Sequence, residues 1–235
     1  MMFDVHCHIL PGIDDGSRDV EMSLEMLRRE TEQDIEGVVF TPHFYAAQND
    51  PETFLRRRDR ALKELEASLN ELPKIPKYTV GSEVHYFRGM SRADGLEDLC
   101  IGNSDYILIE MPFRDWQPVF VDEIEEISTV LGLKVIIAHI ERYFDQDKKL
   151  VKRIIENPNF LIQCNAEFFL EKKTASKAVK FLKKGKIDLL GSDSHNLDDR
   201  KPNLAEALAI IEKYDKKGAL DHINRMSRSI FDQAI

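Results

Sequence analysis

The sequence predicts an α/β protein built around a barrel-like parallel sheet. Short, nearly continuous apolar segments alternate with longer amphipathic segments, a pattern typical of parallel strands that are covered by helices. Seven such strand–helix units fit into 235 residues, a length at which α/β barrels commonly form one domain. No linker rich in proline or glycine divides the chain, so we expect a single domain over residues 1–235. An open, doubly wound sheet is the alternative arrangement.

Each expected strand is a short apolar run that ends at turn-forming residues. Proline cannot donate a hydrogen bond to a neighbouring strand, so Pro42 and Pro112 mark two of these ends. The strands are expected at residues 3–9, 37–41, 78–85, 106–111, 134–139, 161–165 and 187–193.

The segments between the strands carry apolar residues at helical spacing among many charges. Pro73 and Pro76 close the longest of them, and Gly132 and Gly185 each separate a helix from the next strand. Helices are expected at residues 22–33, 51–72, 119–131, 148–156 and 174–184, with two or three further segments between 203 and 235.

The charge balance excludes some classes of function. A formal net charge of −9 argues against nucleic acid as the main partner, since phosphate backbones are held by clustered lysines and arginines. The basic runs at 56–58 and 183–186 are interpreted as solvated helix faces and helix ends. No apolar run approaches the roughly 18 residues of a membrane span. The first strand begins too early for a signal peptide, so a cytoplasmic protein is expected.

The first strand places two imidazoles on one face. His6 and His8 are two residues apart in an apolar run, whereas Cys7 between them faces the opposite side and is expected in the core. Two imidazoles followed by the carboxylates of Asp14 and Asp15 offer the nitrogen and oxygen donors that divalent metals take in proteins.

The later strands end in similar residues. In a barrel of parallel strands the carboxyl ends form one mouth, where active sites are built. An unpaired Glu83 or Glu110 would be costly to bury, so each needs a cation or an arginine as its partner. The donors exceed what one ion takes, and two or three divalent ions are therefore expected. The residues expected at the mouth are His6, His8, His43, Glu83, Glu110, His139, Asn165, Asp193 and His195.

Some histidines also have a purely structural interpretation. His43 fits a loop histidine, and His139 fits a packed core imidazole, as well as a metal ligand. His85, two residues after Glu83, is expected to lie behind the ligands, and His222 is expected to be structural.

The motifs resemble those of a known superfamily in matched order from residue 3 to about residue 202. They are DVHCHILPGIDDG, TPH, GSEV, AHIERY and SDSHNLDDRKP. Together they are similar to the PHP (polymerase and histidinol phosphatase) superfamily, whose fold is a distorted seven-stranded, TIM-like β/α barrel with a trinuclear metal site. More narrowly, they resemble the bacterial manganese-dependent tyrosine phosphatases of the CpsB type. Those enzymes regulate capsular or exopolysaccharide export by dephosphorylating the tyrosine-rich tail of a cognate kinase.

The resemblance implies a set of metal ligands in this chain. Spacing alone does not separate Asp14 from Asp15; Asp15 is preferred and Asp14 is the alternative. The implied groups are His6, His8, Glu83 and Asp193 for one ion, Glu83, Glu110 and His139 for a second, and His43, His195 and Asp15 for a third. Manganese is the expected ion, with iron, zinc or magnesium as alternatives.

The implied reaction is metal-assisted hydrolysis of a phosphomonoester. Arg142 and Arg200 follow His139 and His195 by three and five residues, and are the candidate phosphate clamps, since arginine binds phosphate oxygens in pairs. Aromatic residues after strand ends either line a slot for the phosphotyrosine ring or anchor the core. They are Phe44, Tyr45, Phe87, Phe113 and Trp116.

The cysteines predict neither a disulfide framework nor a nucleophile. Cys7, Cys100 and Cys164 share no motif spacing, so reduced thiols are expected. No cysteine is followed by five residues and then an arginine, so the cysteine-dependent route to phosphotyrosine hydrolysis is absent.

Two rival functions use the same residues. One is a small-molecule phosphatase of the histidinol-phosphate kind or a nucleotide phosphoesterase, and the other is a non-catalytic, metal-containing regulator of polysaccharide assembly. The full ligand set argues against the regulator, because loss of function would remove ligands first.

Overall fold

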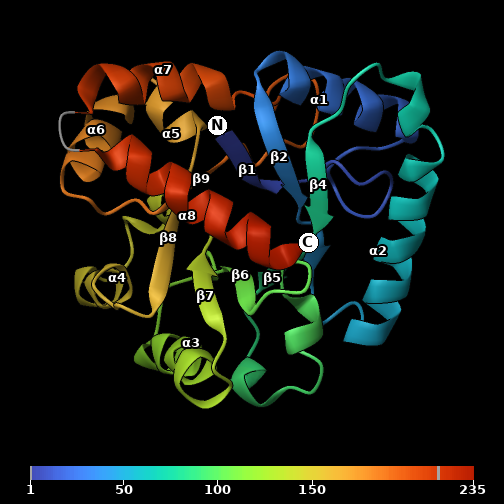
Figure 1. Ribbon diagram of the computed structural model, residues 1–235. Helices are drawn as coiled ribbons and strands as arrows, with labels where there is room; N and C mark the ends of the chain where they lie inside the picture. Colours follow the sequence, from blue (N-terminus) through green and yellow to red (C-terminus); the bar gives the residue numbers. More distant parts are fainter. Residues whose placement is uncertain (1, 216–217) are drawn as a thin grey trace.

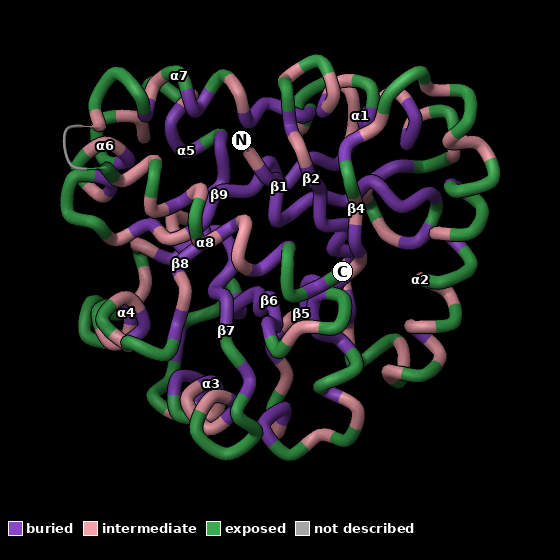
Figure 2. The backbone as a smooth tube through the Cα atoms, in the orientation of Figure 1, coloured by how far each residue is buried: buried purple, intermediate pink, exposed green. Residues whose placement is uncertain are grey.

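The strands lie at the centre of the computed structural model, which describes residues 2–215 and 218–235 (Figure 1). Every pairing recorded between them is parallel. The strands are mostly buried, whereas the outer faces of the helices are exposed (Figure 2). The strands are β1 (Met2–Cys7), β2 (Ile35–Phe40), β3 (His43–Phe44), β4 (Lys77–Val80), β5 (Glu83–His85), β6 (Tyr106–Glu110), β7 (Lys134–Ile137), β8 (Phe160–Asn165) and β9 (Leu189–Gly191).

The strands close into a ring. β1, β2 and β4 form one sheet, and β3, β5, β6, β7, β8 and β9 form the other. β3 continues β2 after a break of two residues, and β5 continues β4 in the same way. The ring closes where Cys7 bridges Ser194 and the N–H of His8 donates to the Ser194 carbonyl at 2.9 Å. Within the described residues the strands thus occupy seven positions of a distorted barrel, so the predicted barrel is confirmed and the open sheet is wrong.

The helices surround the barrel. Aspartates cap three of them, because the side chains of Asp19, Asp50 and Asp147 each accept a hydrogen bond from a backbone N–H in the first turn. No helix in the described ranges combines the length and the apolar character that a membrane crossing requires. The helices are α1 (Val20–Glu32), α2 (Pro51–Glu66), α3 (Pro118–Val130), α4 (Lys148–Ile155), α5 (Glu167–Leu170), α6 (Ala175–Lys183), α7 (Leu204–Tyr214) and α8 (Ala219–Ala234).

The structure differs from the expected helices in two respects: the short helix α5 was not expected, and the long helix after β3 ends early. The helix expected over residues 51–72 ends at Glu66, and the chain continues as the separate 3₁₀ turn η1 (Leu69–Glu71). Ser68 and Asn70 lie in this stretch, and both residue types compete with helical hydrogen bonds. Further 3₁₀ turns are η2 (Met90–Arg92), η3 (Glu97–Leu99) and η4 (Ile140–Tyr143).

Helix α8 closes the end of the barrel where the strands begin. It crosses the strands in Figure 1, and its Ile230 and Phe231 pack against Phe3 of β1 and other interior residues. At Gly102, a Cβ would lie 2.0 Å from the carbonyl oxygen of Ala234, so only glycine admits this approach of the helix. Because apolar side chains fill this end, the buried polar groups of the barrel gather at the opposite end.

Candidate metal centre

The first group of ligand candidates converges on Glu83. His6 on β1 and His8 directly after it are fully buried, and their Nε2 atoms lie 3.2 Å apart. Oε2 of Glu83, at the start of β5, lies 3.3 Å from each of these nitrogens. Oδ1 of Asp193, just beyond β9, lies 3.5 Å from each. The structure thus brings together four side chains from three strands, as expected for a group that shares one cation.

A second group lies on the other side of the Glu83 carboxylate. Nε2 of His139 is 2.8 Å from Oε1 of Glu83 and 3.4 Å from Oε1 of Glu110. The second oxygen of Glu110 lies 2.7 Å from Nδ1 of His85, so His85 holds this carboxylate from behind, as predicted. His43 also faces Glu83, with its Nδ1 2.9 Å from Oε2, and it joins this group to the next.

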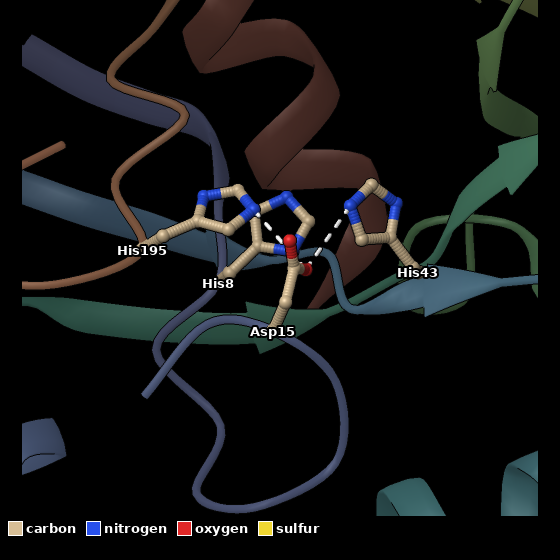
Figure 3. Close-up of side chains that lie close together, drawn as sticks. All are labelled: His8, Asp15, His43 and His195. Carbon is tan, nitrogen blue, oxygen red and sulfur yellow. Dashed lines mark ion pairs between the residues drawn. The ribbon is translucent and has the colours of Figure 1, made fainter. Parts of the chain in front are cut away.

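The third group is shown in Figure 3. Oδ1 of Asp15 lies 3.5 Å from Nε2 of His43 and 3.5 Å from Nε2 of His195, and His8 lies within the same group. The Asp15 side chain is 68% exposed, so it approaches the imidazoles from the solvent side. Asp15, His43 and His195 therefore enclose a position at the rim of the mouth.

Asp14 and Asp15 differ in what they contact. The Asp14 carboxylate accepts hydrogen bonds from Nδ1 of His8 at 2.8 Å, from the backbone N–H of His43 at 2.9 Å and from that of Gly16 at 2.9 Å. These contacts orient His8 with its Nε2 toward Glu83. They also occupy Asp14 away from the cluster. The geometry therefore favours Asp15 as the ligand and Asp14 as the residue that positions His8.

The hydrogen-bond network fixes the tautomer of His195. Its Nδ1–H donates to the carbonyl oxygen of Asp193 at 2.9 Å, which leaves the lone pair on Nε2. Burial and the neighbouring imidazole of His8 lower the pKa of His195, so the neutral form that binds metal is favoured. Nε2 of His195 and Oε2 of Glu83 are among the described buried atoms that make no hydrogen bond, although Nδ1 of His43 lies 2.9 Å from Oε2. A cation would satisfy both atoms, and the residues present therefore fit a metal site.

The carboxylates are held ionised by the imidazoles around them. Although burial opposes a charge on Glu83, the imidazoles of His6 and His43 lower its pKa well below the usual range. Burial also disfavours the His139 cation, yet hydrogen bonds to Glu110 and Glu83 raise the pKa of His139 to about 9. Without metal, protons on the imidazoles thus balance the negative charge of the buried carboxylates. Bound cations would replace these protons.

Gln163 contacts the ligand candidates, and the sequence analysis missed it. It is fully buried on β8, and its Oε1 accepts a hydrogen bond from the backbone N–H of His139 at 2.6 Å and lies 3.4 Å from Nδ1 of His6. Its Nε2 donates to Oδ1 of Asn165 at 2.9 Å, and Asn165 in turn donates to Asp193 at 2.7 Å. A buried amide inside an apolar strand was the available signal.

Both predicted arginine clamps reach the site. Arg142 in η4 and Arg200 after β9 contact the same oxygen of Asp193, at 2.5 and 2.9 Å. Each side chain is 32% exposed, so neither guanidinium is fully enclosed by the protein. The arrangement is suited to binding an anion beside the ligand groups.

The predicted aromatic residues divide into two sets. Phe44 and Trp116 are only 1% and 6% exposed and belong to the core, and Trp116 donates from Nε1 to the carbonyl of Pro112 at 2.9 Å. Phe113, by contrast, is 56% exposed and stacks on His139 with ring centres 6.2 Å apart. Tyr45 is half-buried beside His43, with ring centres 5.2 Å apart.

The remaining sequence predictions concern residues outside the cluster. Cys7, Cys100 and Cys164 are buried free thiols, and Cys7 packs on the side of β1 away from the histidines, as predicted. His222 pairs with Asp188 at 2.8 Å, which fits the predicted structural role. Phe87 is half-buried and packs near Phe44.

Comparisons with known proteins agree on one family. Residues 2–229 match the family described as "Capsular polysaccharide synthesis, CpsB/CapC". The chain is 30% identical over 226 residues to the tyrosine-protein phosphatase CpsB of Streptococcus agalactiae, with 89% of each chain covered. It is 28% identical over 232 residues to the tyrosine-protein phosphatase YwqE of Bacillus subtilis, covering 90% of this chain and 84% of that protein.

Solved structures show the same fold. One chain from the crystal structures of YwqE from Bacillus subtilis and CpsB from Streptococcus pneumoniae, described as unique metal-dependent tyrosine phosphatases, superposes with a TM-score of 0.78. It is 24% identical, with 100% of this chain and 96% of that chain covered. The phosphotriesterase homology protein from Escherichia coli aligns with a TM-score of 0.52, 8% identity and 97% of each chain covered. The chain described here belongs to the CpsB/CapC family.

Proposed function

We propose that this protein is a metal-dependent phosphatase that removes phosphate from phosphotyrosine in a protein substrate. One observation carries the proposal: two groups of imidazoles and carboxylates share Glu83, His8 and His43 join a third group to them, and Arg142 and Arg200 converge on Asp193 beside them. The relatives named as tyrosine-protein phosphatases support the same conclusion.

The ligand groups would hold two or three divalent ions, with manganese as the proposed metal and iron, zinc or magnesium as alternatives. When bound, such ions activate water as a nucleophile and neutralise charge on phosphate oxygens. Gln163, Asp14 and His85 orient the donors from behind. The proposed ligands are His6, His8, Glu83 and Asp193 for one ion, Glu83, Glu110 and His139 for a second, and Asp15, His43 and His195 for a third.

Arg142 and Arg200 bind the phosphate group in this proposal. Both guanidinium groups contact Asp193, and each side chain is partly exposed and has further N–H donors. A phosphate dianion offers more acceptor oxygens than the single carboxylate oxygen they share, so it can accept from both arginines at once. The two side chains would thereby orient phosphorus over the ligand groups.

The aromatic ring of the substrate would lie against Phe113 and Tyr45. Phe113 presents an exposed face above His139, and Tyr45 lies beside His43 and His85 with ring centres 5.2 and 5.3 Å away. Trp116 supports Phe113 through Tyr143, since successive ring centres are 5.1 and 5.7 Å apart. In this proposal Trp116 and Phe44 do not contact the substrate. They form part of the packed core beneath the rings that do. A phenolate leaving group also needs less protonation than an alkoxide, since the pKa of phenol is about 10.

The proposed substrate is the tyrosine-rich tail of a cognate kinase in the cytoplasm, and the proposed process is capsular or exopolysaccharide synthesis. Membership in a capsular polysaccharide family supports the process. The names of the phosphatase relatives support phosphotyrosine as the target.

The test measures steady-state rates on a phosphotyrosine peptide, histidinol phosphate and a dinucleotide, each with manganese and with a chelator. We expect the peptide to have the highest kcat/KM and the chelator to abolish turnover. Glu83→Gln should abolish it as well, whereas the exposed Glu64→Gln on α2 should match the wild-type rate. Preference for histidinol phosphate would replace this proposal with the small-molecule phosphatase. Absence of turnover on every ester, in metal-replete protein, would favour the regulator.

A further inference from the structure

A strongly basic segment lies between β8 and β9 in the sequence. Residues 172–186 contain seven lysines and no acidic residue, in a chain whose formal net charge is −9. All of these residues are described, and six of the lysines are exposed on α6 and its two flanking turns. This lysine face consists of Lys172, Lys173, Lys177, Lys180, Lys183 and Lys184.

Within the described part of the chain, no ion pair is formed by the ammonium groups of the lysine face. Neither residues 2–215 nor residues 218–235 supply a carboxylate within 4 Å of any of the six. The contacts that are recorded are with aromatic rings: Lys177 lies 4.0 Å from the ring centre of Phe144, and Lys183 lies 5.4 Å from that of Tyr214. The positive charge therefore remains available to an anionic partner.

An apolar groove runs beside these lysines. It has a volume of about 460 Å³ and lies between α5, α6 and α7. Its apolar lining includes Phe169, Val179 and Ile210, and Lys180 and Lys183 stand at its edge. A partner that carries both carboxylates and apolar side chains would match this surface, whereas a free anion would use only its charges.

The lysine face is close to the candidate active site. Lys177 rests on Phe144, which is two residues after Arg142. Consecutive Cα atoms are about 3.8 Å apart, so the Cα atoms of Phe144 and Arg142 are at most about 8 Å apart. An extended polypeptide spans about 13 Å with four residues, which exceeds that separation. A chain whose phosphotyrosine occupies the mouth can therefore reach the lysines with residues near its phosphorylated position.

We propose that the lysine face binds an acidic segment of the polypeptide substrate, a few residues away from the phosphotyrosine. The inference rests on the proposed phosphatase function and adds to it a preference for substrates with aspartate or glutamate near the reacting residue. Charge complementarity in an otherwise acidic protein favours this partner, because an acidic polypeptide is repelled elsewhere and attracted here.

The experiment compares two variants of equal charge change. One is Lys172→Glu/Lys173→Glu/Lys180→Glu on the lysine face. The control is Lys63→Glu/Lys74→Glu/Lys77→Glu, three exposed lysines at the end of α2 and the start of β4, at the end of the barrel opposite to the mouth. The substrates are a phosphotyrosine peptide flanked by glutamates, the same peptide flanked by glycine and serine, and p-nitrophenyl phosphate.

We expect the lysine-face variant to lose about tenfold in kcat/KM on the acidic peptide at low salt, because electrostatic attraction commonly changes association rates by 10-fold or more. Rates on the peptide flanked by glycine and serine and on p-nitrophenyl phosphate should match the wild type, which also shows that the variant is folded. The control variant should keep the preference for the acidic peptide. In the wild type, this preference should shrink as salt is raised.

Different failures point to different conclusions. Equal kcat/KM for both peptides in an active wild-type enzyme would overturn the lysine-face proposal and leave the phosphatase intact. Absence of turnover on both peptides and on p-nitrophenyl phosphate would overturn the phosphatase itself. Unchanged peptide kinetics in the variant, together with lost binding to phosphatidylglycerol vesicles, would assign the face to a membrane surface instead.

Discussion

Substitution of Gln163 by leucine should weaken metal binding although Gln163 is not itself a ligand. The change removes the acceptor for the buried His139 N–H, now bonded at 2.6 Å, and the partner of Nδ1 of His6 at 3.4 Å. A buried donor left unsatisfied costs about 1–3 kcal/mol, and His139 already has a strained φ of 29°. Residues that orient ligands change metal affinity by roughly 10- to 100-fold, which corresponds to about 1.4–2.8 kcal/mol.

Calorimetric manganese titration and urea unfolding of Gln163→Leu test this reasoning. The matched control is Gln146→Leu, since Oε1 of Gln146 also accepts a backbone N–H, that of Trp116 at 2.8 Å, but has no contact with the ligand groups. We expect both variants to be less stable and only Gln163→Leu to bind manganese more weakly. Equal manganese affinity in the wild type and Gln163→Leu, with the stability loss present, would refute a positioning role for this amide.

Three further predictions concern charge in and around the barrel. Asp15→Asn should lower the number of bound ions per chain in elemental analysis, whereas Asp14→Asn should keep that number and weaken affinity about tenfold; the opposite pattern would exchange their roles. Chelation should lower the midpoint of thermal unfolding, and manganese at 100 times its Kd should restore about 2.7 kcal/mol of folding stability. A midpoint that does not change with manganese would contradict a metal site in the folded state. Burial and the nearby Asp4 carboxylate raise the pKa of Glu30 well above 4.5. The folded state therefore keeps a proton that the unfolded chain releases, and stability falls as pH rises above 4.5. Relative to the wild type, the free energy of unfolding of Glu30→Gln should increase by up to about 1.4 kcal/mol per pH unit from pH 5 to 8, measured by urea unfolding with chelator. A difference between the two proteins that stays constant with pH would argue against a buried, protonated Glu30.

The periodicity of the sequence predicted the fold and much of the cluster for a simple reason. Side chains alternate along a strand, so His6 and His8 had to share a face and Cys7 had to face away, as the structure shows. Parallel strands of a barrel end at one mouth, so Glu83 and Asp193 had to approach β1 although they are far from it in sequence. That residues 1–235 form one domain stays a prediction.

Other features depended on packing that one sequence does not specify. The two neighbouring carboxylates Asp14 and Asp15 have the same chemistry, but in the folded turn Asp14 accepts the N–H of Gly16, whereas Asp15 approaches two imidazoles. A Cβ at Gly16 would lie 2.3 Å from the carbonyl oxygen of His8. Likewise, Phe113 and Trp116 follow the same strand, and the loop between them leaves one ring exposed and turns the other into the core. Proximity to a strand end predicted the region, but not the direction, of each ring.

The backbone at the ends of β7 and β9 connects the fold to the chemistry. His139 and Asp193 have φ values of 29° and 52°, in the left-handed region that non-glycine residues rarely adopt. Such residues commonly cost on the order of 1–3 kcal/mol each. In both cases the strained residue is held by its own N–H: His139 donates to Gln163 at 2.6 Å, and Asp193 donates to the carbonyl of His6 at 2.8 Å. The acceptor for Asp193 belongs to another ligand candidate, and Gln163 also lies beside His6. The first strand therefore does more than supply two imidazoles, because it also fixes the turns that aim His139 and Asp193 at Glu83.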